Sequence, residues 1–375
     1  MIIDIHGHVT SPALLAKYPM PPSLGDIEGM LDQKSELGIG LTCVGTPVGA
    51  GTMMRIPGHD NYAQTVDELK AHHEWMAETV ATYAPRLRAY AYTNPFGGEP
   101  YLAEVARLVR DEGFIGLMVN TSVQDRYLDD PQVDDFWAMA NELGVPVFLH
   151  PPALPVGSDG IKDMRLVEQV ARFCDVTNAI AVLIFSGVLE KYPDLRLIGA
   201  TAGGATALIA SRLDSAYAPK HWGKKADGPP PGAGGPPPGA GGPPPGAGGP
   251  PPGAGGPPPG AGGPPPGVGG PPGAGGPPPG AGGPPPWARY DNNITRPPTS
   301  FFDQIYVDTA NPNGYHQQAN AECFGIDRML FGTDSPPLTS PLENAIKQIE
   351  DLPFDDAAKQ RIFTDNAKEL FDLDV

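Results

Sequence analysis

Short apolar runs recur along the chain and alternate with longer stretches in which apolar residues repeat at helical spacing. The first run, residues 1–10, contains Ile2, Ile3 and Ile5, whose β-branched side chains favour a strand. Seven further runs lie at 41–45, 85–92, 114–120, 145–150, 195–201, 305–308 and 327–334. Runs this apolar are typical of strands that are buried on both faces of a parallel sheet.

Most of the segments between these runs have the apolar spacing of amphipathic helices. The predicted helices lie at 26–37, 61–83, 100–112, 134–143, 166–184, 203–217 and 342–371. Gly38 and Gly40 end the first helix, and Gly144 ends the fourth. Eight strands that alternate with helices predict an α/β fold, a (β/α)8 barrel of the TIM type.

Polar residues occupy the carboxyl ends of the predicted strands, which favours a closed barrel over an open sheet. These residues are His6, His8, His150, Thr201, Asp308 and Asp334. In a barrel such ends converge on one face, where active sites are built, whereas in an open sheet the first and last strands would often be far apart. The chain has neither a GxGxxG nor a GxxxxGK[ST] motif to support a nucleotide site.

The pair His6 and His8 is the strongest chemical signal in the chain. Side chains alternate along a strand, so the two imidazoles are expected on one side, with Asp4 on the same side one step deeper. Two imidazoles at the end of a buried strand suit a divalent metal. A surface turn that carries two histidines by chance is the alternative.

One segment cannot belong to a core. Residues 228–286 consist almost entirely of Pro, Gly and Ala in the repeat Pro-Pro-Pro-Gly-Ala-Gly-Gly. Such a segment has almost nothing to bury, so we predict a disordered insert between the sixth helix and the seventh strand. Residues 1–227 and 287–375 then form the two parts of one barrel. Repeat expansion without function is the favoured interpretation of the insert, and a ligand for a polyproline-recognising partner is the alternative.

Charge and cysteine content narrow the class of protein. The formal charge is −18 at pH 7, which argues against nucleic acid or an anionic membrane as a partner. No apolar run approaches the ~20 residues of a transmembrane helix, and the acidic start does not match a basic leader.

Cys43, Cys174 and Cys323 form no CxxC pattern, so we expect a reduced, cytoplasmic setting in which each is a small buried residue.

Four motifs together carry a resemblance to a known family. They are His6-Gly-His8, Tyr127-Leu-Asp-Asp-Pro131, Leu149-His150-Pro151 and Phe331-Gly-Thr-Asp334-Ser-Pro336. Their order resembles that of the metal-dependent amidohydrolase-2 group, which includes aminocarboxymuconate-semialdehyde decarboxylase, γ-resorcylate decarboxylase and 4-oxalomesaconate hydratase. The resemblance covers nearly the whole chain apart from the insert.

The resemblance implies a metal-dependent enzyme, a hydrolase or carbon–carbon lyase. His6, His8, His150 and Asp334 would hold one divalent ion, and this mixed N/O shell fits zinc, with manganese or another first-row ion as the alternative. The substrate would be a small carboxylated compound, such as an aromatic or ring-cleavage acid, that is decarboxylated or hydrolysed. A hydratase of an unsaturated oxo-acid is the alternative activity. Members of the group are commonly dimers or larger, so a homodimer is expected.

One position departs from the family pattern. The family carries a histidine in a His-x-Gly-Gly motif at the end of the sixth strand, where this chain has Thr201. A threonine hydroxyl is not a base near neutral pH. Either another group takes over the proton, with Asp334, His316 and His59 as candidates, or the chain is a metal-binding barrel that has lost the ancestral reaction.

A second catalytic candidate lies on the loop after the second strand. In the resembling decarboxylase an arginine in this region binds a substrate carboxylate, which implies that role for Arg55. A surface arginine is the alternative. Met53 and Met54 could line an apolar pocket beside it, and Asp308 is expected to anchor a neighbouring loop or a metal ligand rather than to bind metal itself.

Overall fold

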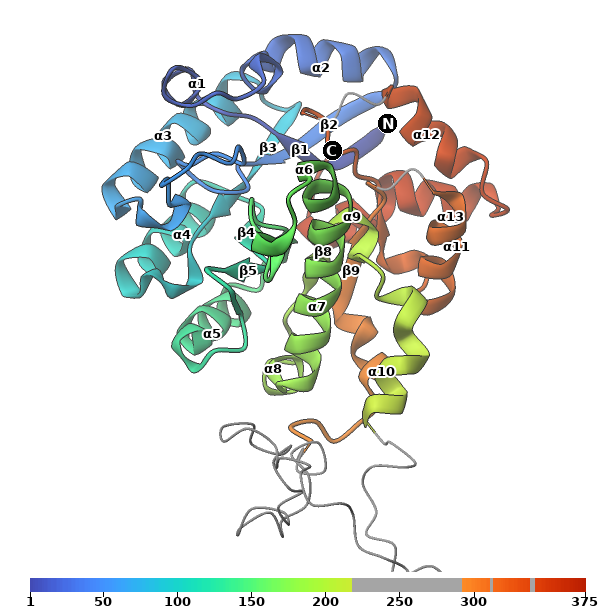
Figure 1. The fold of residues 1–375 in the computed structure, drawn as a ribbon. Helices are drawn as coiled ribbons and strands as arrows, with labels where there is room; N and C mark the ends of the chain where they lie inside the picture. Colours follow the sequence, from blue (N-terminus) through green and yellow to red (C-terminus); the bar gives the residue numbers. More distant parts are fainter. Residues whose placement is uncertain (218–291, 311–312, 338–340) are drawn as a thin grey trace, which may run out of the picture. The chain divides into compact units, whose positions relative to one another are not determined.

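Parallel strands form the centre of the molecule (Figure 1). The structure is a computed structural model that describes residues 1–217, 292–310, 313–337 and 341–375, so the predicted insert at 228–286 lies outside the described residues. Within those residues, one sheet has eight strands in the order β1-β2-β3-β4-β7-β8-β9-β10. The strands are β1 Ile2–His8, β2 Ile39–Gly45, β3 Leu87–Tyr92, β4 Gly116–Asn120, β7 Val147–His150, β8 Leu197–Gly199, β9 Ile305–Asp308 and β10 Met329–Leu330.

The sheet closes on itself between its first and last strands. The backbone N–H of Ile5 in β1 donates to the carbonyl of Phe331, at 2.9 Å, and the N–H of Asp334 donates to the carbonyl of His6, at 2.7 Å. These two bonds join the first and last strands, as the closure of a barrel requires. The predicted (β/α)8 barrel is therefore confirmed.

Helices surround the barrel in Figure 1. They are α1 Pro12–Lys17, α2 Ile27–Glu36, α3 Val66–Thr82, α4 Glu99–Asp111, α5 Asp134–Leu143, α6 Met164–Leu166, α7 Arg172–Phe185, α8 Val188–Lys191, α9 Ala200–Gly203, α10 Ala210–Tyr217, α11 Gly314–Cys323, α12 Leu342–Glu350, α13 Asp356–Gln360 and α14 Asn366–Phe371. A π-helical segment, η6 Val167–Ala171, joins α6 to α7. None of the described helices is long and apolar enough to cross a membrane.

Two layers of apolar side chains alternate along the strands. Tyr90, Met118 and Phe148 belong to the layer inside the barrel. Leu117 and Leu149, their neighbours in sequence, belong to the layer between the sheet and the helices. This alternation explains why the strands are apolar on both faces.

The structure corrects the predicted helices at several places: the short helices α1, α8 and α9 were not predicted, and two larger differences have a clear cause. Helix α11 has no predicted counterpart, because the residues that it buries are His316, Gln317 and Asn320, which give no apolar periodicity. The predicted helix 342–371 is broken between α12 and α13, around Pro353, which cannot continue a helix.

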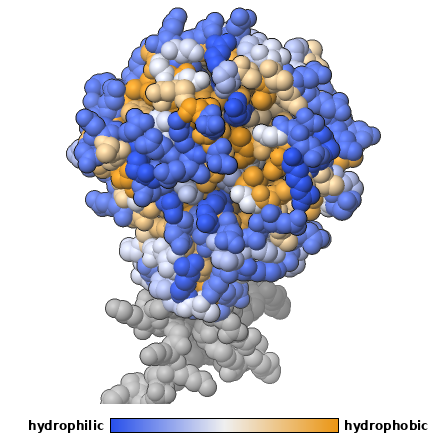
Figure 2. Space-filling view, turned by 180° about the vertical axis from the view of Figure 1, so that it is seen from behind, coloured by the Kyte–Doolittle hydropathy of each residue, from blue (hydrophilic) through white to orange (hydrophobic). Residues whose placement is uncertain are grey.

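The cysteine prediction is also corrected at one position. Cys43 is buried and Cys323 is half-buried, but Cys174 is exposed, so the expectation that it is buried is wrong. The face shown in Figure 2 is mostly hydrophilic with interspersed apolar patches, as the high content of acidic residues leads one to expect.

Candidate metal centre and pocket

The histidine pair at the end of β1 is aimed by an irregularity in the strand. The register of β1 against β2 shifts between Asp4 and Gly7, as in a β-bulge. Ile3 and Ile5 pack inside the barrel, and beyond the shift His6 also faces inward, with its ring 4.8 Å from that of Phe148. His8 lies beside it, with the two ring centroids 5.0 Å apart.

The expectation that Asp4 lies beside the imidazoles is wrong, and the bulge is the reason. The carboxylate of Asp4 accepts a hydrogen bond from Nζ of Lys34 on helix α2, at 2.7 Å, and both side chains are buried. Asp4 also accepts hydrogen bonds from the backbone N–H and the hydroxyl of Thr333, at 3.0 and 2.6 Å. It therefore ties β1 to the residue that precedes Asp334, instead of joining the histidines.

The four predicted metal ligands come together at the carboxyl end of the barrel. One ligand atom from each of His6, His8, His150 and Asp334 lies within 4.8 Å of the other three. Nε2 of His6 is 3.2 Å from Nε2 of His8, and the carboxylate of Asp334 lies 3.0 Å from Nε2 of His8 and 3.5 Å from Nε2 of His6. A tetrahedral ion with bonds of 2.0–2.1 Å separates its ligands by about 3.3 Å. The donor set therefore fits such an ion.

Hydrogen bonds fix the orientation of all three imidazoles. Nδ1 of His6 lies 2.5 Å from the carboxylate of Asp308, Nδ1 of His8 lies 3.0 Å from the carbonyl of Gly45, and Nδ1 of His150 lies 2.8 Å from the carbonyl of Pro151. Because each acceptor requires a proton on Nδ1, each Nε2 has a lone pair for a cation.

The electrostatics of the cluster favour a positive charge at its centre. Burial would raise the pKa of Asp334, but His6, His8 and His150 outweigh it and hold that pKa well below its usual range. Burial lowers the pKa of His6, but Asp334 and Asp308 outweigh it and raise the pKa overall. A cation bound between them would meet the same attraction.

Asp308 contacts a predicted metal ligand and a neighbouring turn, as the sequence predicts. Besides the contact to Nδ1 of His6, its carboxylate accepts hydrogen bonds from the backbone N–H groups of Ala202 and Ala310, at 2.6 and 3.2 Å. It is fully buried on β9. Asp308 thus connects a metal ligand to the turn after β8.

That turn holds Thr201 in an unusual backbone conformation. Strand β8 ends at Gly199, earlier than predicted, and Thr201 and Ala202 both have positive φ, 52° and 57°. This left-handed region is disfavoured for a β-branched residue. Asp308 holds the N–H of Ala202, and the side chain of Asn320 donates to its carbonyl at 3.0 Å. The turn places Thr201 in the wall of the pocket above the ligand cluster.

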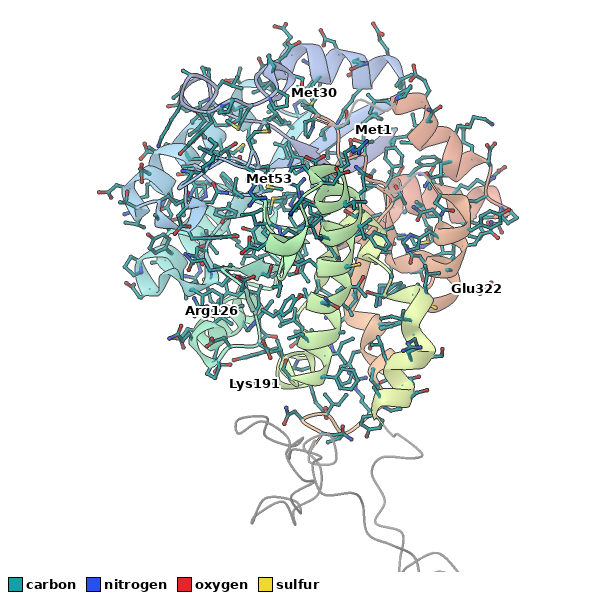
Figure 3. The ribbon with its side chains drawn as sticks, in the orientation of Figure 1. Met1, Met30, Met53, Arg126, Lys191 and Glu322 are labelled. Atoms are coloured by element: carbon teal, nitrogen blue, oxygen red, sulfur yellow. The ribbon has the colours of Figure 1, made fainter. Side chains whose placement is uncertain are left out.

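The pocket has a volume of about 410 Å³, which suits a single-ring compound. His8, His150 and Asp334 contribute to its lining. Most of the rest of the wall is apolar, from residues such as Val48 and Phe173. Met53, labelled in Figure 3, also lines the pocket, together with Met54, as the sequence suggested.

Three predicted candidates lie elsewhere. Arg55 is exposed and is not among the described residues that line the pocket; its Nη1 lies 4.0 Å from the sulfur of Met164. His59 contacts Asn61, and His316 is buried on α11 with its ring 5.7 Å from that of Phe173. Neither histidine is among the described residues that line the pocket, so neither is placed to replace the histidine that the family pattern has at position 201.

Sequence reasoning missed Arg172. It lies within the continuous helical stretch formed by α6, η6 and α7, which follows the strand carrying His150, and its side chain lines the pocket. An arginine within a helix has no spacing pattern that would have singled it out.

Comparisons with known proteins agree with this geometry. A family model described as amidohydrolase matches residues 3–231 and 273–373. The chain is 28% identical over 119 residues to 2-amino-3-carboxymuconate-6-semialdehyde decarboxylase from Dictyostelium discoideum, an alignment that covers 32% of this chain and 33% of that protein. It is 32% identical over 151 residues to γ-resorcylate decarboxylase from Polaromonas sp. strain JS666, covering 38% and 46%. The matched part thus spans less than half of these curated relatives.

Solved structures share the fold over nearly the full length. A 5-carboxyvanillate decarboxylase from Sphingomonas paucimobilis has a TM-score of 0.69 and 16% identity, and the match covers 99% of both chains. A dihydroxybenzoic acid decarboxylase from Polaromonas sp. JS666, solved with bound manganese and 2-nitroresorcinol, has a TM-score of 0.67 and 20% identity, covering 100% of this chain and 97% of that one. At these identities the likeness shows the fold alone.

Proposed function

Since the chain belongs to the amidohydrolase family, we propose that it is a metal-dependent enzyme that decarboxylates a small aromatic or ring-cleavage acid. The observation that carries the proposal is the cluster of three imidazoles, each anchored through Nδ1, around the carboxylate of Asp334. The named activities of the partial relatives, which are decarboxylases of carboxylated compounds, support the choice of reaction.

His6, His8, His150 and Asp334 would hold the ion. A divalent ion in such a site acts as a Lewis acid on a substrate oxygen. We propose zinc or manganese: the nitrogen-rich donor set suits zinc, and a structural neighbour was solved with manganese.

The remaining residues of the pocket supply orientation and proton transfer. The apolar wall excludes water and packs against the ring of the substrate. When the carbon–carboxyl bond breaks, carbon dioxide leaves and the electron pair on the ring carbon takes up a proton. Thr201 is not a base near neutral pH. We therefore assign proton transfer to Asp334, whose side chain is 23% exposed and lines the pocket.

The proposal is tested by measuring carbon dioxide release from a panel of hydroxybenzoates and ring-cleavage acids with the zinc- or manganese-loaded full chain. We expect release from at least one acid, and its loss together with the metal in the His150→Ala variant. Hydrated or hydrolysed products without carbon dioxide would instead support the hydratase or hydrolase alternative.

Thr201 favours a second candidate, a metal-binding barrel without the ancestral activity. The Thr201→His variant restores the residue that the family pattern has at this position. If the parent is inactive on the panel and this variant is active, the second candidate is correct. If the parent is already active, the second candidate is excluded.

A further inference from the structure

We infer that Arg172 binds a second carboxylate of the substrate, separate from the group that meets the metal ligands, so that the pocket selects compounds with two acid groups. The inference rests on the proposed function and deepens it. It moves the role of carboxylate recognition from Arg55, which is exposed, to a residue in the pocket wall.

The guanidinium of Arg172 has unused hydrogen-bonding capacity. Its Nε is buried and has no hydrogen-bond partner within the described residues. Nη2 makes one long contact, at 3.5 Å, to the carbonyl of Ala153. A guanidinium has five N–H donors, and a buried donor without a partner is costly. Nε therefore lacks an acceptor, which a ligand could provide.

Its charge also forms no close ion pair within the described residues. Glu168 and Asp334 are close enough to interact with Arg172 electrostatically, but neither forms an ion pair with it in the described part of the chain. Burial lowers the pKa of Arg172, although an arginine in a protein stays protonated. Arg172 as a whole is half-buried, and a cation held partly away from water without an ion-pair partner is unfavourable, so an incoming anion reduces that cost.

Arg172 is the only lysine or arginine among the described residues that line the pocket. The lining as a whole is mainly apolar, and Phe173 follows Arg172 in sequence, while Glu168 and Gln169, one turn earlier, also line the pocket. In such surroundings a planar carboxylate can pair with the guanidinium through two parallel hydrogen bonds. The cavity, about 410 Å³, is large enough for a single-ring compound, and both Arg172 and members of the ligand cluster line it.

The helix that carries Arg172 is firmly held. Asp175, one turn further along α7, is buried and accepts hydrogen bonds from the hydroxyls of Thr121, Ser122 and Tyr127, at 2.5, 2.8 and 3.0 Å. These contacts fix the start of α7 against the segment after β4. Arg172 is therefore positioned before a substrate arrives, as a specificity-determining group requires.

Calorimetry with the metal-loaded full chain tests the inference. The probes are benzoate, with one carboxylate, and phthalate, isophthalate and terephthalate, with two. We expect at least one diacid to bind about tenfold to a hundredfold more tightly than benzoate, the range for charge-assisted hydrogen bonds. Arg172→Gln should reduce that ratio to about one with little change for benzoate, and Arg172→Lys should keep part of it.

Arg55→Gln is the matched control, because it removes an exposed arginine from the same face, and the ratio should not change. A parent without a diacid preference, or an Arg172→Gln variant that keeps it, would overturn the inference. Stability gives a further readout: removal of a half-buried charge without an ion-pair partner by Arg172→Met should not lower the free energy of unfolding, whereas loss of a structural residue would.

The two proposals fail separately, since binding is measured without turnover. A chain that prefers diacids through Arg172 but releases no carbon dioxide contradicts only the proposed reaction. A chain that decarboxylates monoacids and diacids equally well, with or without Arg172, contradicts only the inference.

Discussion

The two sides of the pocket differ in how completely their polar groups are paired. On the side of the ligand cluster, each of the three imidazoles has a second contact through Nδ1, such as Asp308 for His6 and the backbone carbonyl of Gly45 for His8. On the side of β8 and α7, Thr201 sits in a disfavoured backbone conformation and Arg172 has a buried nitrogen without a partner among the described residues.

This difference separates the groups that the folded protein orients in advance from those that gain a partner only when the substrate binds. Ligand geometry for a cation must be set in advance, because small errors in position weaken binding sharply. Groups that recognise a substrate can remain unpaired at some cost in stability, because the substrate supplies the missing contact. Substitutions on the two sides should therefore have different consequences.

The largest effect is expected on the paired side, for the loss of a metal ligand. His150→Ala should abolish stoichiometric binding of zinc or manganese, because three ligands remain and the cluster loses one of its lone pairs. His59→Ala removes a histidine outside the cluster and should leave the metal content unchanged. Metal analysis of both purified variants checks this, and retention of one ion per chain by His150→Ala would show that the cluster is not the site.

A stability effect of about 3–5 kcal/mol is expected for Lys34→Met, because it leaves the buried carboxylate of Asp4 without its counter-ion. Lys191→Met breaks the exposed pair with Asp134 and should cost less than about 1 kcal/mol. Urea unfolding of the full chain measures both. Equal effects would mean that the Asp4–Lys34 pair does not support the barrel.

Asp308→Asn should weaken metal binding by about tenfold to a hundredfold, the usual cost of a lost partner behind a ligating histidine. Competition with a chelator of known affinity gives the ratio. Asp303→Asn, at an exposed position near the other end of β9, is the control and should leave the affinity unchanged. An unaltered affinity in Asp308→Asn would mean that Asp308 does not orient His6.

The smallest effect is expected on the unpaired side, and its sign is opposite. Thr201→Gly should raise the free energy of unfolding by up to about 1 kcal/mol, since glycine adopts positive φ without strain. Thr82→Gly, at an exposed helical threonine, should lower it by a similar amount or less. A destabilised Thr201→Gly would show that the threonine side chain, rather than the backbone, holds the turn.

The sequence predicted the paired side much better than the unpaired side. His6, His8, His150 and Asp334 were recognisable because each lies at or just beyond the end of an apolar strand, where the barrel brings such ends together. Asp4 was misplaced because a bulge shifts the side chains that follow it, and alternation alone does not reveal a bulge.

Arg172 and helix α11 show the opposite limit. An arginine within a helix has no spacing signature, and only the folded chain shows that this side chain lines a cavity and that its buried Nε has no partner among the described residues. Helix α11 buries polar residues, so the hydrophobic pattern that predicted the other helices is missing there.

Barrel closure makes the ligand cluster depend on contacts between distant parts of the sequence. His6 enters the barrel with β1 and Asp334 follows β10, so the four-residue cluster does not exist until β10 has been made and has docked beside β1. Contacts this distant in sequence form late and slowly. An ion that binds only the assembled cluster would then stabilise closed barrels selectively over fragments or unclosed intermediates.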